Sequence, residues 1–125
     1  MTTKEIAEKL VTMCRTGNFQ ELYQELFSPD IVNIEPEGTP NHITKGLAAL
    51  QQKGKEWDEM ITEVHSSSVS DPVVGDSYFA CQMRLEATFK GSPEVTILDE
   101  LCVYEVRDGK IVKEQFFYDP APAFA

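Results

Sequence analysis

Residues 99–111, which read DELCVYEVRDGKI, carry the clearest structural pattern in the sequence. Strand-forming residues fill the stretch before the pair Asp108-Gly109, which is typical of a tight turn, and a second strand-like run follows the pair. This pattern predicts a β-hairpin with strands over residues 94–107 and 110–118.

Two further strands are predicted before this hairpin, over residues 62–70 and 77–90, where the sequence again has a period of two. Turn signals separate the strands, at Asp71-Pro72, Gly75-Asp76 and Gly91-Ser92-Pro93. Because these connections are short, neighbouring strands are expected to be antiparallel.

The first half of the chain has the periodicity of helices instead. Thr2 and Glu5 form a capping box that starts one helix, and Gly17 ends it. Asn18 repeats the capping pattern for a second helix, which is expected to end at residues 28–29, where a proline follows.

A short strand is predicted over residues 30–35, and Thr44 is the predicted cap of a third helix. The apolar face of that helix consists of Leu47, Leu50, Trp57 and Ile61. About three N-terminal helices followed by an antiparallel sheet place the chain in the α+β class.

The strand over residues 94–107 is apolar on both faces, unlike its neighbour. One face holds Leu98, Cys102, Tyr104 and Val106, and the other holds Val95, Ile97, Leu101 and Val103. An outer sheet face that is apolar at its centre needs a second cover, so the sequence predicts a homodimer through that face.

Composition narrows the classes of partner. The chain has 125 residues, 42% of them hydrophobic, and a formal net charge of −10. That charge would repel nucleic acids and anionic membranes, so neither is an expected partner. No apolar run has the length of a signal peptide or a membrane-spanning helix, which indicates a soluble protein.

The cysteines Cys14, Cys81 and Cys102 are odd in number and widely spaced. They suggest neither a disulfide framework nor a zinc site, and a reducing compartment, the cytoplasm, fits them best. The two histidines lack a second ligand at metal-binding spacing, and no cofactor motif is present, so no metal or cofactor is expected.

The two capped helices, the strand ending at residues 34–36 and the hairpin motif together resemble the nuclear-transport-factor-two-like superfamily. The match is closest to the SnoaL-like proteins, because of residues 99–111 and the run EQFFY at 114–118. The resemblance implies a strongly curved, cone-shaped antiparallel sheet wrapped around helices, as in cystatin-like folds. It covers residues 1–119 as one domain and leaves 120–125 as a tail.

Glu35 and Glu100 are the candidate catalytic residues. The steroid isomerases that this chain resembles have an acid followed by proline at the place of Glu35, and that acid is the base that moves a proton next to a carbonyl. They also have an acid near Glu100, which would donate a hydrogen bond to an oxyanion. A register error of one residue would exchange Glu100 with Asp99.

A tyrosine of those isomerases corresponds to Leu10 here, and Tyr23, Tyr104 or Tyr118 would have to replace it. The predicted ligand-binding residues, each of which also fits an ordinary structural place, are Trp57, His65, Phe79, Met83, Tyr104, Phe116 and Tyr118. For His65 there are two alternatives, a residue that orients an inward carboxylate and an ordinary structural or surface histidine, and the second is favoured.

The fold hosts both enzymes and binding modules, so it does not identify a reaction. We expect a SnoaL-like protein that binds a small apolar ligand in the cavity of the cone. One alternative is a cofactor-independent isomerase, cyclase or dehydratase that transfers a proton on a small carbonyl compound. The other alternative is a dimerisation or structural module.

Overall fold

The computed structural model describes residues 1–120, which form an α+β fold of three helices and one sheet of seven strands. The helices are α1 (Thr3–Thr16), α2 (Phe19–Leu26) and α3 (Leu47–Met60). The strands are β1 (Phe27–Ile34), β2 (Ile43–Lys45), β3 (Ile61–Val69), β4 (Val73–Gly75), β5 (Tyr78–Phe89), β6 (Val95–Arg107) and β7 (Lys110–Phe117).

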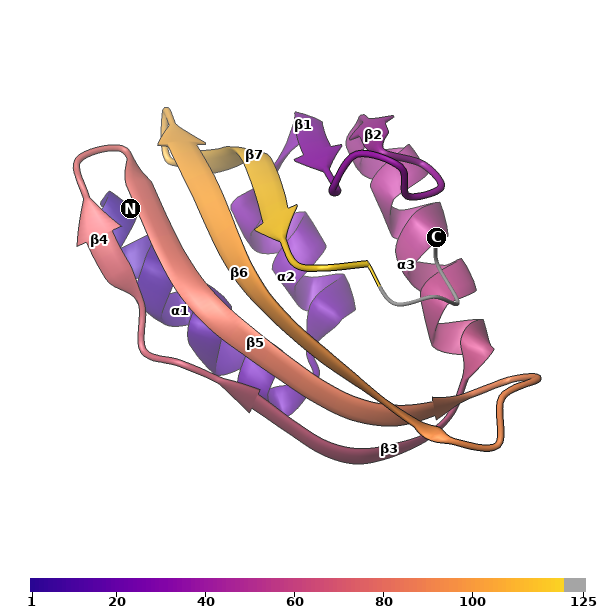
Figure 1. Ribbon diagram of the computed structural model, residues 1–125. Helices are drawn as coiled ribbons and strands as arrows, with labels where there is room; N and C mark the ends of the chain where they lie inside the picture. The colour runs from indigo at the N-terminus through magenta and orange to yellow at the C-terminus, as the bar shows by residue number, and fades with distance from the viewer. Residues whose placement is uncertain (121–125) are drawn as a thin grey trace.

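The sheet is strongly curved and open. Its strand order is β2-β1-β7-β6-β5-β3, with β4 paired to β5, so the two outermost strands do not pair with each other. The long strands β5 and β6 bend along their length, with α1 and α2 on the concave side and α3 beside β1 and β2 (Figure 1). The predicted curved α+β sheet around helices is confirmed, as an open sheet.

The apolar face of α1 packs against the concave side of the sheet and forms the core. Ile6 and Leu10 of this helix are fully buried. They belong to the same cluster as Phe79 and Tyr104, whose rings stack with centroids 4.7 Å apart. This packing fills one end of the concave side with side chains and leaves the other end for polar groups.

The local signals of the first helix are confirmed. Thr2 Oγ1 accepts a hydrogen bond from the Glu5 backbone over 3.1 Å, and the Glu5 carboxylate accepts one from the Thr2 backbone over 3.0 Å. Gly17 has a φ of 76°, the left-handed conformation that ends many helices.

Two predicted helix boundaries are wrong. The second helix ends at Leu26, because the chain pairs with the sheet from Phe27 onward. The third helix begins after Gly46 rather than at Thr44, which lies in β2. The Gly46 amide donates to the Ile31 carbonyl over 2.8 Å, so the chain leaves the sheet only at this residue.

The four predicted long strands are present and pair in antiparallel fashion. The sequence reasoning missed β2 and β4, which have three residues each and are too short to show a period. It also missed the parallel pairing of β1 with β7, which brings Asn33 opposite Glu114. This pairing joins the two halves of the chain and positions most of the site.

The two faces of β6 differ in exposure. On the concave face, Glu100 lies opposite Met83 and Tyr104 opposite Phe79. On the outer face, Ile97 is 54% exposed and Leu101 is 56% exposed. The outer face therefore has apolar side chains that nothing within residues 1–120 covers. No helix within residues 1–120 is long and apolar enough to cross a membrane.

Candidate functional site

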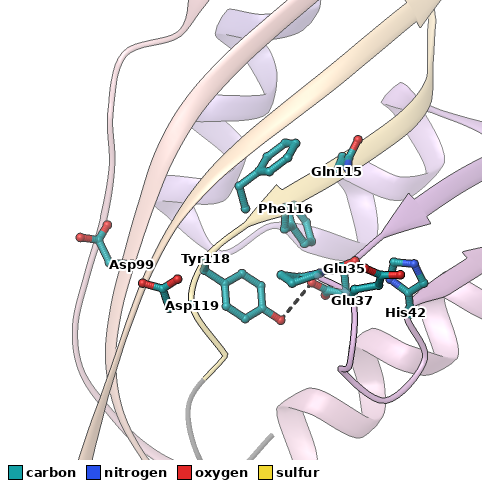
Figure 2. Close-up of a pocket in the computed structure, with 10 residues that line it drawn as sticks. Glu35, Glu37, His42, Asp99, Gln115, Phe116, Tyr118 and Asp119 are labelled. Carbon is teal, nitrogen blue, oxygen red and sulfur yellow. Dashed lines mark hydrogen bonds between the residues drawn. The ribbon is translucent and has the colours of Figure 1, made fainter. Parts of the chain in front are cut away.

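An open pocket of ≈ 680 Å³ lies where β1 and β7 end side by side. Its walls combine acidic, aromatic and polar side chains: Glu35, Pro36, Glu37, His42, Asp99, Gln115, Phe116, Phe117, Tyr118 and Asp119. Figure 2 shows Glu35, His42 and Tyr118 gathered on one side, whereas the Asp99 carboxylate is directed away from them. Of the four acids that line the pocket, Glu35 is half-buried, whereas Glu37, Asp99 and Asp119 are exposed.

The side chain of Glu35 is held at both carboxylate oxygens. The Tyr118 hydroxyl donates to Oε2 over 3.1 Å, as the dashed line in Figure 2 marks. The Lys53 ammonium, on α3, lies 3.3 Å from Oε1. The Glu35 side chain is 14% exposed and that of Lys53 is 23% exposed, so this pair is partly shielded from water.

The backbone of Glu35 is fixed as well. Its amide donates to the His42 carbonyl over 2.8 Å, and its own carbonyl lies 2.7 Å from His42 Nδ1. These contacts close the loop between β1 and β2. They place the carboxylate at a defined point on the pocket wall.

A second row of polar groups lies behind Glu35. Lys53 Nζ also donates to Asn33 Oδ1 over 2.6 Å, and Asn33 Nδ2 donates to Glu114 Oε1 over 2.8 Å. Asn33 is 1% exposed and Glu114 is 5% exposed. The parallel register of β1 and β7 makes these two residues direct neighbours.

The sequence reasoning did not select Glu114, because strict alternation from the buried Ile111 would direct its side chain outward. A register shift between β6 and β7 reverses the alternation, so Glu114 lies opposite Tyr104 on the concave face. The sequence does contain a pattern that points to Glu114. Phe116 and Tyr118 are both predicted to face the ligand, and Glu114 lies on the same face of an alternating strand as these two residues. Asn33 and Lys53 gave no comparable signal.

The environment favours the protonated form of two carboxyl groups. Burial raises the pKa of Glu100 to about 8, and the negative charges of Glu35 and Glu114 add to the shift. Burial likewise raises the pKa of Glu114 to about 7, against the hydrogen bond from Asn33. Burial, followed by the charge of Glu35, raises the pKa of Tyr118 as well. Burial therefore favours the protonated form of Glu100 and Glu114, whereas Glu35 lies between the Tyr118 hydroxyl and the Lys53 ammonium.

Glu100 faces the concave side, as the preferred register predicted, and Asp99 lies on the outer face, bonded to Gln82 over 2.8 Å. Glu100 Oε1 accepts a weak hydrogen bond from Cys102 Sγ over 3.8 Å. Glu100 is not among the residues that line the pocket. It lies close enough to Glu35 and Glu114 for their charges to raise its pKa.

The predicted ligand-binding residues are divided among several places. Phe116 and Tyr118 line the pocket. Phe79 and Tyr104 stack on each other in the core, and Met83 packs against that core half-buried. This core cluster includes Ile6 and Leu10 of α1, and none of the three residues lines the pocket.

Trp57 and His65 also lie away from the pocket walls. The Trp57 ring contacts Phe89, with centroids 5.2 Å apart. His65 bonds to Thr88 Oγ1 over 2.7 Å, and a register shift between Val64 and Ser66 accompanies its outward position. His65 is exposed, which agrees with the favoured structural or surface place.

Leu10, at the position where the isomerases have a tyrosine, is fully buried in the core. Of the alternative tyrosines, Tyr23 packs edge-on against Phe27, with centroids 5.3 Å apart. Tyr104 stacks in the core, and Tyr118 reaches Glu35. Tyr118 is the tyrosine that the structure brings to the acid.

This arrangement suits proton transfer at a carbon next to a carbonyl. A carboxylate at the pocket wall can take the proton, and neutral acids nearby can donate hydrogen bonds to the oxygen that becomes negative. Carboxyl groups held neutral by burial are suited to the second role.

Comparison with known proteins identifies the family. The model of the SnoaL-like domain matches residues 1–118. A solved protein from Mesorhizobium loti, named as a SnoaL-like polyketide cyclase, is 33% identical, with a TM-score of 0.89 over 94% of this chain and all of that one. No curated protein matches the sequence.

More distant structures share the fold alone. A protein from Catenulispora acidiphila with a ketosteroid-isomerase-like fold, in complex with trimethylamine, is 17% identical, with a TM-score of 0.72 over 92% of this chain and 85% of that one. A protein from Xanthomonas campestris with a cystatin-like fold is 21% identical, with a TM-score of 0.71 over 94% and 90% of the two chains. The chain therefore belongs to the SnoaL-like domain family.

Proposed function

We propose that this protein binds a small, largely apolar carbonyl compound beside Glu35 and transfers a proton on it, using protein side chains alone. The observation that carries the proposal is the Glu35 carboxylate, which lies on the pocket wall between the Tyr118 hydroxyl and the Lys53 ammonium. Phe116, on the same face of β7 as Glu114, supplies apolar surface in the pocket wall. The polyketide cyclase name of the Mesorhizobium loti relative is compatible with carbonyl chemistry.

The proposed reaction begins with Glu35 as the general base. Its Oε2 takes a proton from the carbon next to the carbonyl, and the electrons of the broken C–H bond form an enolate. The Tyr118 hydroxyl, which lines the pocket, stabilises the enolate oxygen by donating a hydrogen bond. Glu35 then returns the proton to the same carbon or to another one, so the protein is regenerated.

The test is α-proton exchange into D₂O, followed by ¹H NMR with 2-tetralone, cyclohexanone and 2-cyclohexenone as probes. Wild-type protein should accelerate exchange of at least one of these ketones. Glu35→Gln removes the base with little change of shape, and the rate should fall by about 10²- to 10⁴-fold.

The matched control is Glu59→Gln, which removes one negative charge from an exposed position on α3. Its exchange rate should equal that of the wild type. Circular dichroism checks that both variants fold. The proposal is refuted by wild-type protein that exchanges none of the three ketones faster than a heat-denatured sample does, or by an E35Q variant that retains the full rate.

A second candidate is a binding module without catalysis. It is favoured by the position of Glu100 outside the pocket wall and by Leu10, which leaves the site without the tyrosine of the isomerases. Native mass spectrometry of freshly purified protein discriminates the two functions. A retained small molecule together with no ketone exchange would favour the binding module.

Two further expectations belong with the proposed function. We propose that the partner of this chain is a second copy, bound through the outer face of the sheet, where Ile97 and Leu101 are more than half exposed. A reducing compartment, the cytoplasm, is favoured by the free thiols of Cys14, Cys81 and Cys102.

A further inference from the structure

A continuous path of hydrogen bonds connects the pocket to a second acid that never reaches the pocket wall. From the pocket inward, the path runs through Tyr118, Glu35, Lys53, Asn33 and Glu114. Asn33 and Glu114 belong to β1 and β7, Glu35 and Tyr118 directly follow these strands, and Lys53 lies in the middle of α3. Every contact in the path is a side-chain contact, and the inner end is almost completely buried.

Donor and acceptor chemistry fixes the direction of this path. The Lys53 ammonium can only donate, so the atom of Asn33 that faces it must be the carbonyl oxygen. The amide nitrogen of Asn33 must then face Glu114, whose Oε1 accepts. Asn33 therefore has one orientation that satisfies both neighbours, and Lys53 is held where it meets Glu35.

The charges of the path explain why a second acid is useful. While Glu35 is ionised, Lys53 has a direct counter-ion. When Glu35 takes a proton from a substrate it becomes neutral, and a partly buried ammonium would lose its partner at some energetic cost. The charge of Glu35 is one cause of the raised pKa of Glu114, so neutralising Glu35 favours release of the Glu114 proton to solvent. The resulting Glu114 carboxylate lies across Asn33 from the ammonium and supplies the compensating negative charge.

We propose that Asn33, Lys53 and Glu114 form a positioning network for Glu35, which orients its carboxylate and supplies the counter-charge when Glu35 is protonated. This inference rests on the proposed role of Glu35 as the base. None of the three residues touches the substrate in this scheme. They act through Glu35 alone.

The first test measures the network without any substrate. In protein labelled with ¹³C-glutamate, the side-chain carboxyl signal of Glu114 is assigned by its loss in Glu114→Gln and titrated by NMR. The positive charge of Lys53 lowers the pKa of Glu114, so Lys53→Met should raise it above its value of about 7. Lys53→Arg keeps the charge and should leave the pKa near the wild-type value.

Lys55→Met is the matched control, because Lys55 is an exposed lysine on the same helix. It should not change the titration of Glu114. A second readout uses Glu114→Gln, which keeps an acceptor for Asn33 but removes the charge. Because the charge of Glu114 raises the pKa of Glu100, this variant should lower it. Unchanged titration of Glu114 in K53M, or of Glu100 in E114Q, would overturn the network.

The second test uses the exchange of α-protons in 2-tetralone. A network that positions the base should affect turnover rather than binding, so K53M should lower kcat roughly tenfold with KM unchanged, and K53R should restore it. Full kcat in K53M overturns the positioning role. A wild-type protein that exchanges no ketone refutes the proposed function instead, and the NMR titrations then decide on the network by themselves.

Discussion

At the scale of single residues, the buried acids make stability depend on pH in an unusual direction. The pKa of Glu100 is raised from 4.5 to about 8, so the folded protein keeps a proton that the unfolded chain releases. The stabilisation linked to that proton is complete below pH 4.5 and is lost as the pH rises to about 8. Glu114 acts in the same direction up to about pH 7.

We therefore expect the free energy of unfolding of the wild type to fall between pH 5 and pH 8 as far as these two acids contribute. Glu100→Gln cannot ionise, and its Oε1 can still accept from Cys102, so this variant should lose less stability over the same interval. Urea unfolding at both pH values measures the difference, with Glu59→Gln as the exposed control. An equal fall in wild type and E100Q would contradict the raised pKa of Glu100.

Single residues also show where sequence reasoning succeeds at the site and where it stops. Glu35 could be predicted from the sequence, because a carboxylate at a strand end before Pro36 is unusual locally and stands where the isomerases that the sequence resembles have an acid. Lys53 could not be predicted as a site residue, because a lysine on a helix is ordinarily solvated. Only the packing of α3 beside β1 turns its ammonium toward Glu35.

At the scale of elements, the first helix owes part of its stability to the capping box. Thr2→Ala removes the side-chain acceptor for the Glu5 amide, and the loss should be about 1 kcal/mol of unfolding free energy. Thr12→Ala is the matched control, because its hydroxyl bonds to the Glu8 carbonyl within the helix and alanine is the better helix former. Thermal unfolding should show a lower Tm for T2A alone. A T2A variant as stable as T12A would show that the cap contributes little.

The accuracy of the sequence reasoning follows the range of the interactions that define each element. The start of α1 and its end at Gly17 depend on residues within one turn, so they were predicted. The parallel pairing of β1 with β7 depends on residues about eighty positions apart, and no local pattern announces it. The register shift that turns Glu114 inward lies in the hairpin of β6 and β7, where Val106 pairs with Ile111 and Glu105 with Lys113, and a strict period of two in the sequence does not reveal it.

At the scale of the whole molecule, the site lies at the junction of the two halves of the chain. The helical half supplies Glu35 and Lys53, and the sheet half supplies Glu114 and Tyr118. Helix α1 fills the other end of the concave side with apolar side chains. The same curved sheet thus has a packed end that stabilises the fold and an open end where polar groups meet a pocket.

The opposite face of the sheet carries the last prediction. Leu101 lies beside Phe117 in the register of β6 and β7, and with Val95 and Ile97 they form an exposed apolar row, here called the outer row. Exposed apolar rows of this kind are typical of interfaces between subunits. Size-exclusion chromatography with light scattering at micromolar concentration should therefore return twice the 14.1 kDa of one chain.

Leu101→Glu places a charge at the centre of the outer row, and its burial between two copies without a partner would be costly, so this variant should be monomeric. Phe19→Glu is the control, because Phe19 is 44% exposed on α2, on the helical side of the sheet. It should stay dimeric. Since each chain carries a net charge of −10, added salt should strengthen the dimer by screening repulsion. A wild-type mass of 14.1 kDa would show a monomer and would contradict the proposed dimer.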